Sequence, residues 1–232
     1  MIPKVIHYFW FGNNKKTRLI HKCIKSWKKF LPDYKIVEWN ETNVDLINAP
    51  QYVKDAYENK KYAFVADYFR FWAIYNYGGI YLDTDMQIIK NIDLFLSYSS
   101  VIGFGSKEEI AGGIICSEKD NSLIKQLMDS YSISSFFIDG KMNLTTIVDR
   151  ITKVYKKAGF LLNNSLQIIQ GNAVFPQEYF YAKDYFTKKI TITNNTYAIH
   201  HYDGSWLSKK ERLILKTPNW ILKIYKKVRH GK

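Results

Sequence analysis

The sequence predicts an α/β domain whose mainly parallel sheet is flanked by helices. Short apolar runs alternate with segments of helical period, and clusters of Gly, Pro, Asn and Asp separate them. The chain has 232 residues, of which 47% are hydrophobic and 16% aromatic. This length and composition allow one domain with a substantial core. In such sheets ligands bind beyond the carboxyl ends of the strands, so we look for functional side chains there.

The first half of the chain supplies the clearest elements. Apolar or alternating runs predict strands, and apolar residues three and four apart predict helices. A Gly78-Gly79 pair marks the turn from the last of these helices into the next strand. The predicted strands cover residues 4–11, 34–39 and 80–82, and the predicted helices cover residues 17–30, 52–59 and 63–77.

The second half is less regular. We expect strands at residues 100–104, 112–117 and 166–170, helices at 121–130 and 144–158, and further strands between 190 and 199. Residues 175–186 are rich in aromatic side chains and are expected to be irregular.

Two carboxylates follow the strand at 80–82. In an extended strand alternate side chains share a face, so we expect Asp83 and Asp85 to lie together. Two such carboxylates repel each other, and a hard divalent cation such as Mn²⁺ or Mg²⁺ removes that repulsion. The pattern Asp83-Thr84-Asp85 therefore predicts a site for a metal ion and the phosphates that it bridges.

A charged pair interrupts the otherwise apolar helix at 63–77. Asp67 and Arg70 are three residues apart and so share one helix face. Burying either charge alone would be costly. The pair is either an ordinary ion pair or part of the same site.

The net charge of +13 is concentrated at the C-terminal end. Residues 209–232 contain nine basic residues and one acidic residue, Glu211, which gives +8. Apolar residues at helical spacing lie between the basic ones. This pattern predicts a basic amphipathic helix on an anionic membrane surface; a helix packed on the body with a solvated lysine face is the alternative. No accompanying motif favours nucleic acid as a partner.

Other sequence features bear on location. Residues 1–7 lack the pattern of a cleavable leader, and no apolar stretch reaches the roughly 18 residues of a membrane span. The cysteines, Cys23 and Cys116, fit no zinc or redox spacing. We therefore expect a cytoplasmic protein.

Several motifs, in this order and spacing, resemble the DXD-containing sugar transferases of glycosyltransferase family 32, and more distantly the large clostridial glucosylating toxins. That family includes bacterial capsular polysaccharide enzymes and yeast mannosyltransferases. The matching segments are residues 2–12, 26–27, 39–40, 67–70, 78–85 and 200–206.

The resemblance implies a GT-A fold, a Rossmann-like sheet that binds a nucleotide-sugar together with Mn²⁺ or Mg²⁺. We therefore expect residues 1–208 to form the GT-A catalytic domain, followed by the basic amphipathic segment 209–232. The resemblance also implies transfer with retention at the anomeric carbon, by a covalent or a front-face route.

The resemblance also assigns roles to residues. Asp85 would bind the metal directly, and Asp83 would contact ribose or sugar hydroxyls and reach the metal through water. Asp67 and Arg70 would hold the donor sugar. The aromatic roles fall to Trp10, against the nucleobase, and Trp206, over the β-phosphate.

A histidine in the C-terminal motif would complete the metal site. His201 is preferred because His201-x-x-Gly204 resembles a pattern of related retaining galactosyltransferases, and His200 is the competitor because consecutive strand residues point in opposite directions. One departure concerns residues 111–114, where relatives often carry Asn. The glycines here would instead allow a close approach to the backbone.

The function expected from these observations is a metal-dependent retaining glycosyltransferase. It would move a hexose or N-acetylhexosamine, with UDP-sugars favoured, to a glycan or lipid-linked oligosaccharide acceptor in capsule or surface polysaccharide synthesis. It would work at the inner face of the plasma membrane. Two rival hypotheses are an aspartate-nucleophile phosphatase and a non-catalytic adaptor at a membrane surface.

Overall fold

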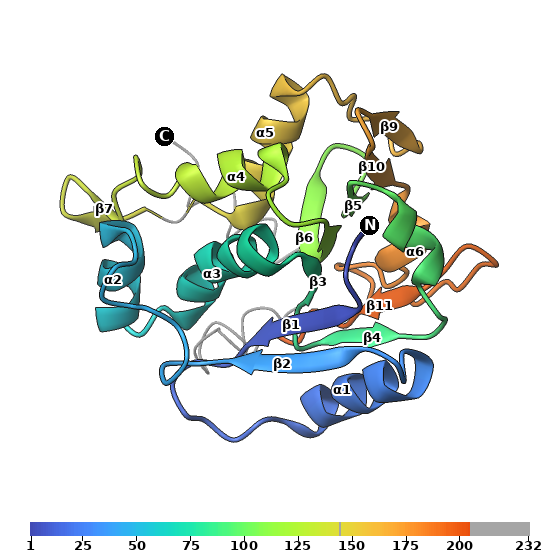
Figure 1. Cartoon of the computed structure of the whole chain (residues 1–232), viewed down its shortest axis with the longest axis horizontal. Helices are drawn as coiled ribbons and strands as arrows, with labels where there is room; N and C mark the ends of the chain where they lie inside the picture. Colours follow the sequence, from blue (N-terminus) through green and yellow to red (C-terminus); the bar gives the residue numbers. More distant parts are fainter. Residues whose placement is uncertain (144, 205–232) are drawn as a thin grey trace.

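A seven-stranded mixed sheet forms the centre of the molecule (Figure 1). The computed structural model describes residues 1–143 and 145–204. The strand order is β2-β1-β3-β6-β5-β10-β9. The strands are β1 (Val5–Phe9), β2 (Lys35–Trp39), β3 (Gly79–Leu82), β5 (Ser100–Phe104), β6 (Ile110–Ser117), β9 (Gln167–Ile169) and β10 (Asn172–Phe175).

The two faces of this sheet are covered by separate layers with separate cores. One apolar cluster lies under α2, α3, α4 and α5, and the other lies under α1, η1 and α6. Figure 1 shows α2 to α5 on one side of the sheet and α1 on the other. The helices are α1 (Arg18–Phe30), α2 (Gln51–Glu58), α3 (Tyr62–Tyr77), α4 (Ser122–Asp129), α5 (Ile147–Lys157), α6 (Gln177–Phe180) and the 3₁₀ helix η1 (Asp93–Ser97).

Two short antiparallel pairs complete the described structure. In one, β4 (Met86–Ile88) pairs with β11 (Ala198–His200), and in the other β7 (Phe137–Ile138) pairs with β8 (Lys141–Met142). The first pair joins the chain just after β3 to the last described strand, more than a hundred residues later. It therefore brings two distant segments to one place.

Most predicted elements are present, but the sheet is not mainly parallel. β1 pairs in parallel with β2 and β3, whereas β6 runs antiparallel to both β3 and β5. The expected strands across 190–199 reduce to β11 and an isolated bridge between Lys183 and Ile190. The basic segment 209–232 lies outside the described residues.

The predicted turn before β3 is confirmed. Gly78 ends α3 at a φ of 64° and its N–H donates to the Ile74 carbonyl, while Gly79 has a φ of 104°. A Cβ at Gly79 would lie 2.5 Å from the Val5 carbonyl oxygen. Only glycine accommodates both this backbone and the close approach of β1.

Among the described residues, no helix is both long and apolar enough to span a bilayer.

Candidate functional site

The two carboxylates lie in a tight turn where β3 ends. The Met86 N–H donates to the Asp83 carbonyl at 2.9 Å, so residues 83–86 form a β-turn between β3 and β4. The alternation of an extended strand does not apply there, and that reason for expecting the two side chains together was wrong. They come together because the turn and β11 hold them around one imidazole.

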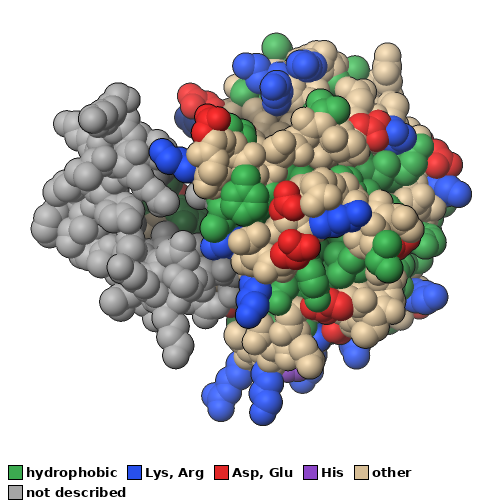
Figure 2. Space-filling view, turned by 90° about the vertical axis from the view of Figure 1, so that its left-hand side faces the viewer, with side chains coloured by type: hydrophobic (Ala, Val, Ile, Leu, Met, Phe, Trp, Pro, Cys, Tyr) green, Lys and Arg blue, Asp and Glu red, His purple; other side chains and the backbone are tan. Residues whose placement is uncertain are grey.

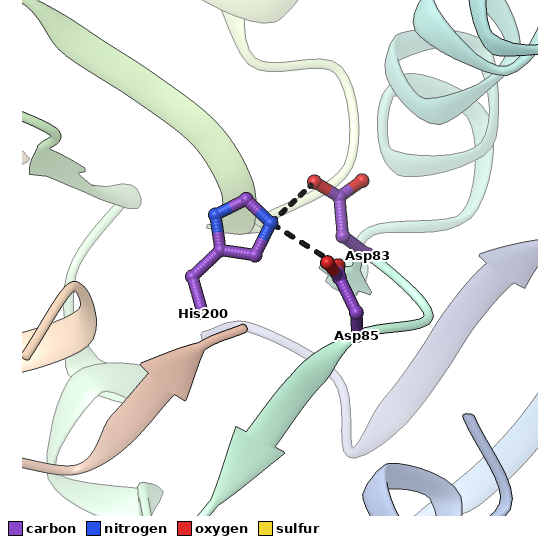
Figure 3. Close-up of side chains that lie close together, drawn as sticks. All are labelled: Asp83, Asp85 and His200. Atoms are coloured by element: carbon purple, nitrogen blue, oxygen red, sulfur yellow. Dashed lines mark hydrogen bonds and ion pairs between the residues drawn. The ribbon is translucent and has the colours of Figure 1, made fainter. Parts of the chain in front are cut away.

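That imidazole belongs to His200, at the end of β11. Its Nε2 lies 3.1 Å from Asp85 Oδ1 and 3.6 Å from Asp83 Oδ2 (Figure 3). Ligand atoms of all three side chains lie within 4.8 Å of one another. The segment after β11 also holds Asp85, because the Asp203 N–H donates to Asp85 Oδ2 at 2.8 Å and the His201 N–H donates to the Asp85 carbonyl at 3.1 Å.

His201 does not face the two carboxylates. Its Nε2 lies 2.9 Å from Gln87 Oε1, on the other side of the β4–β11 ribbon. In the register of this ribbon, His200 pairs with Met86 and Ile199 with Gln87. Of the two histidines, His200 is therefore the one whose side chain lies beside the carboxylates, whereas the side chain of His201, the residue preferred from the sequence, does not.

Asp85 and His200 stabilise each other's charged forms. Burial opposes ionisation of Asp85, but His200 and the Asp203 N–H outweigh it and lower the Asp85 pKa to about 2. Burial likewise disfavours the imidazolium, but the charge of Asp85 and its hydrogen bond raise the pKa of His200 above its usual value of 6.5. Without a metal, a proton on His200 thus balances the carboxylates.

A second charge group adjoins the first. Arg70 on α3 donates through Nη2 to Asp67, and its Nη1 lies 3.3 Å from Asp83 Oδ1. The Arg70 Nη1 also donates to the Gly112 carbonyl at 2.8 Å. The helix spacing predicted the Asp67–Arg70 contact, and the structure adds Asp83, which is common to both groups.

Burial controls the ionisation of this second group. It raises the pKa of Asp67 to about 6, although the Arg70 charge acts in the opposite direction. Burial disfavours the Arg70 charge too, but Tyr81, Asp67 and Asp83 together raise its pKa further. Arg70 therefore remains a permanent cation between two carboxylates.

Two tyrosines, Tyr81 and Tyr181, support the site. The Tyr81 hydroxyl donates to Asp83 Oδ1 at 2.5 Å, and the Arg70 guanidinium lies 4.4 Å from the centre of the Tyr81 ring. Tyr81 precedes Asp83 by two residues, a spacing that could have identified it. The buried Tyr181 hydroxyl accepts the Gly113 and Ile114 N–H groups at 3.0 and 3.3 Å, and no sequence signal indicated this.

The glycines of β6 allow this close packing. Asp83 donates its N–H to the Gly113 carbonyl, and a Cβ at Gly113 would lie 3.2 Å from Asp83 Oδ2. A Cβ at Gly112 would lie 2.8 Å from Ile151 Cδ1. The close approach expected at these glycines is therefore made by the protein's own side chains.

The remaining predicted residues are placed as follows. Trp10 follows β1 at the same sheet edge as Asp83, and its Nε1 donates to the Asn14 carbonyl at 2.7 Å. His7, which lies within the matching segment 2–12, is buried, with its Nε2 at 2.9 Å from the Gly78 carbonyl and its Nδ1 accepting from Trp39, which fits a structural role. Trp206 lies outside the described residues.

The sequence was compared with known proteins. Residues 17–102 match the family described as "Glycosyltransferase sugar-binding region containing DXD motif", and Asp83-Thr84-Asp85 lies within that match. Inositol phosphoceramide mannosyltransferase 3 of Schizosaccharomyces pombe is 28% identical over 130 residues, which are 55% of this chain. The match covers 36% of that relative, so this chain spans about a third of its length.

Solved structures share the fold. The structure described as "PaToxG Glycosyltransferase" has a TM-score of 0.52 at 22% identity, covering 68% of this chain and 70% of that one. A glycosyltransferase involved in glycosylation of the major capsid of PBCV-1 has a TM-score of 0.50 at 11% identity, covering 93% and 100%. The predicted α/β fold is thus confirmed as a mixed sheet flanked by helices, similar to GT-A glycosyltransferase structures.

Residues 17–102 are thus similar to a DXD-containing glycosyltransferase sugar-binding region, and the described fold is similar to that of solved glycosyltransferases.

Proposed function

We propose that this protein is a metal-dependent glycosyltransferase that moves a sugar from a nucleotide-sugar to a glycan acceptor. The observation that carries the proposal is the convergence of Asp83, Asp85 and His200 at the end of β3, within a chain whose residues 17–102 match a DXD glycosyltransferase region. The three residues come from segments far apart in the sequence, and their ligand atoms lie within 4.8 Å of one another.

The donor set fits a divalent cation. Two carboxylate oxygens suit Mg²⁺ or Mn²⁺, and the imidazole nitrogen favours Mn²⁺. Asp83, Asp85 and His200 would hold the ion. Once bound, a divalent ion stabilises the negative charge that grows on a nucleoside diphosphate leaving group.

The protein's own groups supply the rest of the site. Asp67 and Arg70 are fixed on α3 beside Asp83, where a carboxylate can accept from sugar hydroxyls and a guanidinium can donate to them. Trp10 lies at the carboxyl end of the neighbouring strand, where an aromatic ring can stack on a nucleobase. Tyr81 donates to Oδ1 of the Asp83 carboxylate, whereas His200 lies near Oδ2.

Finer features of the function rest on the family resemblance alone. We propose a UDP-sugar donor carrying a hexose or N-acetylhexosamine, and transfer with retention. The acceptor is a lipid-linked oligosaccharide in capsule or surface polysaccharide synthesis. The enzyme works in the cytoplasm at the inner face of the plasma membrane, and the basic segment 209–232 keeps it beside that acceptor.

The rival functions have less support. An aspartate phosphatase needs an Asp free to attack, whereas Asp83 contacts Tyr81, Arg70 and His200. A non-catalytic adaptor would not require buried charges clustered at a sheet edge. The DXD family match favours the transferase over both.

The test is thermal stability of the purified protein with a panel of UDP-, GDP- and CMP-sugars, each with Mn²⁺ or with EDTA. A ligand that binds only the folded state raises its stability, so one donor should raise the Tm in a metal-dependent manner. Asp85→Ala should lose that shift. If no donor raised the Tm, the proposal would be contradicted, and the phosphatase and adaptor hypotheses would be favoured again.

A further inference from the structure

The chain between α6 and β11 forms a hairpin at residues 183–192. Lys183 and Ile190 form an antiparallel bridge, and the Thr191 N–H donates to the Ala182 carbonyl at 2.9 Å. Asp184 closes the tip, because its carboxylate accepts from the Thr187 N–H and hydroxyl and from the Phe186 N–H. We call this segment the 183–192 hairpin.

Large apolar side chains lie exposed on the 183–192 hairpin. Phe186 is 57% exposed and Ile192 59%, and Tyr185 and Ile190 are exposed as well. A soluble surface seldom gathers such side chains on one short segment unless they contact something apolar.

The polar groups of the hairpin are mainly basic. Lys188 and Lys189 are exposed beside the apolar side chains, whereas Lys183 points inward and donates to the His201 carbonyl at 2.6 Å. The acidic residue, Asp184, is engaged by the turn that it caps. The outer surface therefore combines exposed hydrocarbon with positive charge, as the boundary between acyl chains and anionic headgroups requires.

We propose that the 183–192 hairpin binds the surface of an anionic lipid bilayer, with Phe186, Ile190 and Ile192 entering the headgroup boundary and Lys188 and Lys189 contacting lipid phosphates. This contact is made by residues of the described fold. Membrane binding by the hairpin needs no nucleotide-sugar, so it can be tested independently of the transferase proposal.

The hairpin is joined to the candidate site by ring contacts. Tyr185 packs edge-on against Tyr202, with ring centres 5.2 Å apart, and Tyr202 lies 4.2 Å from the His200 ring. A bilayer bound by the hairpin would thus lie beside the metal-binding residues. That position suits an acceptor carried on a lipid.

A glycan is a weaker candidate for this surface. Sugars stack on open aromatic faces, but the Lys188 ammonium lies over the Tyr185 ring at 4.4 Å, and Phe186 packs against the same ring. Ile190 and Ile192 offer a sugar no stacking face. A bilayer boundary accommodates the aliphatic, aromatic and basic side chains together.

Another exposed apolar region provides the control. Residues 133–142, around β7 and β8, also expose large apolar side chains, including Phe137 at 40%. Asp139 and Lys141 cancel in charge there. Figure 2 shows the face that carries α2 and β7, where acidic and basic side chains are intermixed. That region lacks the excess of positive charge found on the 183–192 hairpin.

The first experiment measures partition of the full chain onto vesicles of phosphatidylcholine, with and without phosphatidylglycerol. Lys188→Ala combined with Lys189→Ala should weaken binding to the anionic vesicles by about 30-fold, at about 1 kcal/mol per lysine. The free energies that separate segments contribute to vesicle binding add. The 30-fold difference between the unsubstituted chain and this double variant should therefore persist whatever residues 209–232 contribute. The control pair, Lys156→Ala with Lys157→Ala at the exposed end of α5, should change binding little. Equal effects of the two pairs would overturn the proposal.

The second experiment tests insertion directly. Cys23 and Cys116 are both buried, so an environment-sensitive fluorophore should label only a new surface cysteine. The labelled Phe186→Cys variant should shift to the blue on anionic vesicles and be quenched by nitroxide lipids, whereas the labelled Phe137→Cys variant should not. No difference between the two labels would overturn the proposal. The proposal would also be overturned if the fluorescence of the Phe186→Cys label changed only with a soluble glycan acceptor or with protein concentration.

Discussion

The two charge groups that share Asp83 are balanced in different ways. On the α3 side, Asp67 and Asp83 face Arg70, whose guanidinium keeps its charge at every accessible pH. On the β11 side, Asp83 and Asp85 face His200, whose charge depends on a removable proton. The first group is a fixed part of the fold. In the proposed function, the second group exchanges this proton for a metal ion.

The largest effect should come from removing the permanent cation. Arg70→Met would remove a buried cation and leave the half-buried carboxylates of Asp67 and Asp83 without it, which should lower the free energy of unfolding by about 3–5 kcal/mol. His200→Ala removes a hydrogen bond to a charged group and should cost less, about 1.5–3 kcal/mol. Urea denaturation followed by circular dichroism measures both.

A surface ion pair provides the control for this comparison. Lys125 and Asp129 pair on the exposed side of α4, so Lys125→Met should leave the urea midpoint unchanged. If Arg70→Met changed the urea midpoint as little as Lys125→Met, the structural role of the charge group around Arg70 would be refuted.

The removable proton predicts a pH dependence of metal binding. The metal needs neutral His200, and the pKa of His200 is raised above 6.5 by Asp85 despite burial. Below that pKa, Mn²⁺ affinity should fall by about tenfold per pH unit. Calorimetric titration with Mn²⁺ across pH values measures the slope, and an affinity independent of pH between 5.5 and about 7 would contradict this account.

The same pKa predicts how the metal-free protein responds to pH. Because the folded-state pKa of His200 is raised, its protonated form contributes stability that is fully present below pH 6.5. That contribution is lost as the pH rises through the folded-state pKa. His200→Ala should flatten this part of the stability profile, whereas His201→Ala should leave it in place.

The smallest effect should come from the glycine under Asp83. Gly113→Ala brings a methyl group to 3.2 Å from Asp83 Oδ2, so the carboxylate must move by a few tenths of an ångström. We expect a loss of about 1 kcal/mol in Mn²⁺ binding, or about fivefold in Kd. Gly112→Ala meets the flexible end of Ile151 instead and should change unfolding more than binding. The reverse ranking would contradict the placement of Asp83.

The sequence predicted those parts of the site whose residues are close along the chain. Asp67 and Arg70 could be recognised as neighbours because they are three residues apart on one helix. Asp83 and Asp85 are close in sequence, but a turn and the distant β11, rather than strand alternation, bring their side chains together. The sequence could not decide between His200 and His201, because the choice depends on the pairing register of β11 with β4. A slip of one residue exchanges the two faces of a strand.

Strand direction and tertiary anchors were beyond sequence reasoning for a similar reason. The apolar run of β6 predicts a buried strand, but nothing local shows that it runs antiparallel to β3 and so places Gly113 opposite Asp83. Tyr181 lies in a segment expected to be irregular, and its hydroxyl reaches β6 from 67 residues away in sequence. Such contacts are set by the folded arrangement of distant segments.

The central claim, that His200 completes a metal site with Asp83 and Asp85, is tested most directly by Mn²⁺ titration of His200→Ala and His201→Ala beside the unsubstituted protein. The account predicts that His200→Ala loses Mn²⁺ binding while His201→Ala, whose side chain contacts Gln87, retains it. Loss of binding in His201→Ala with retention in His200→Ala would contradict the account.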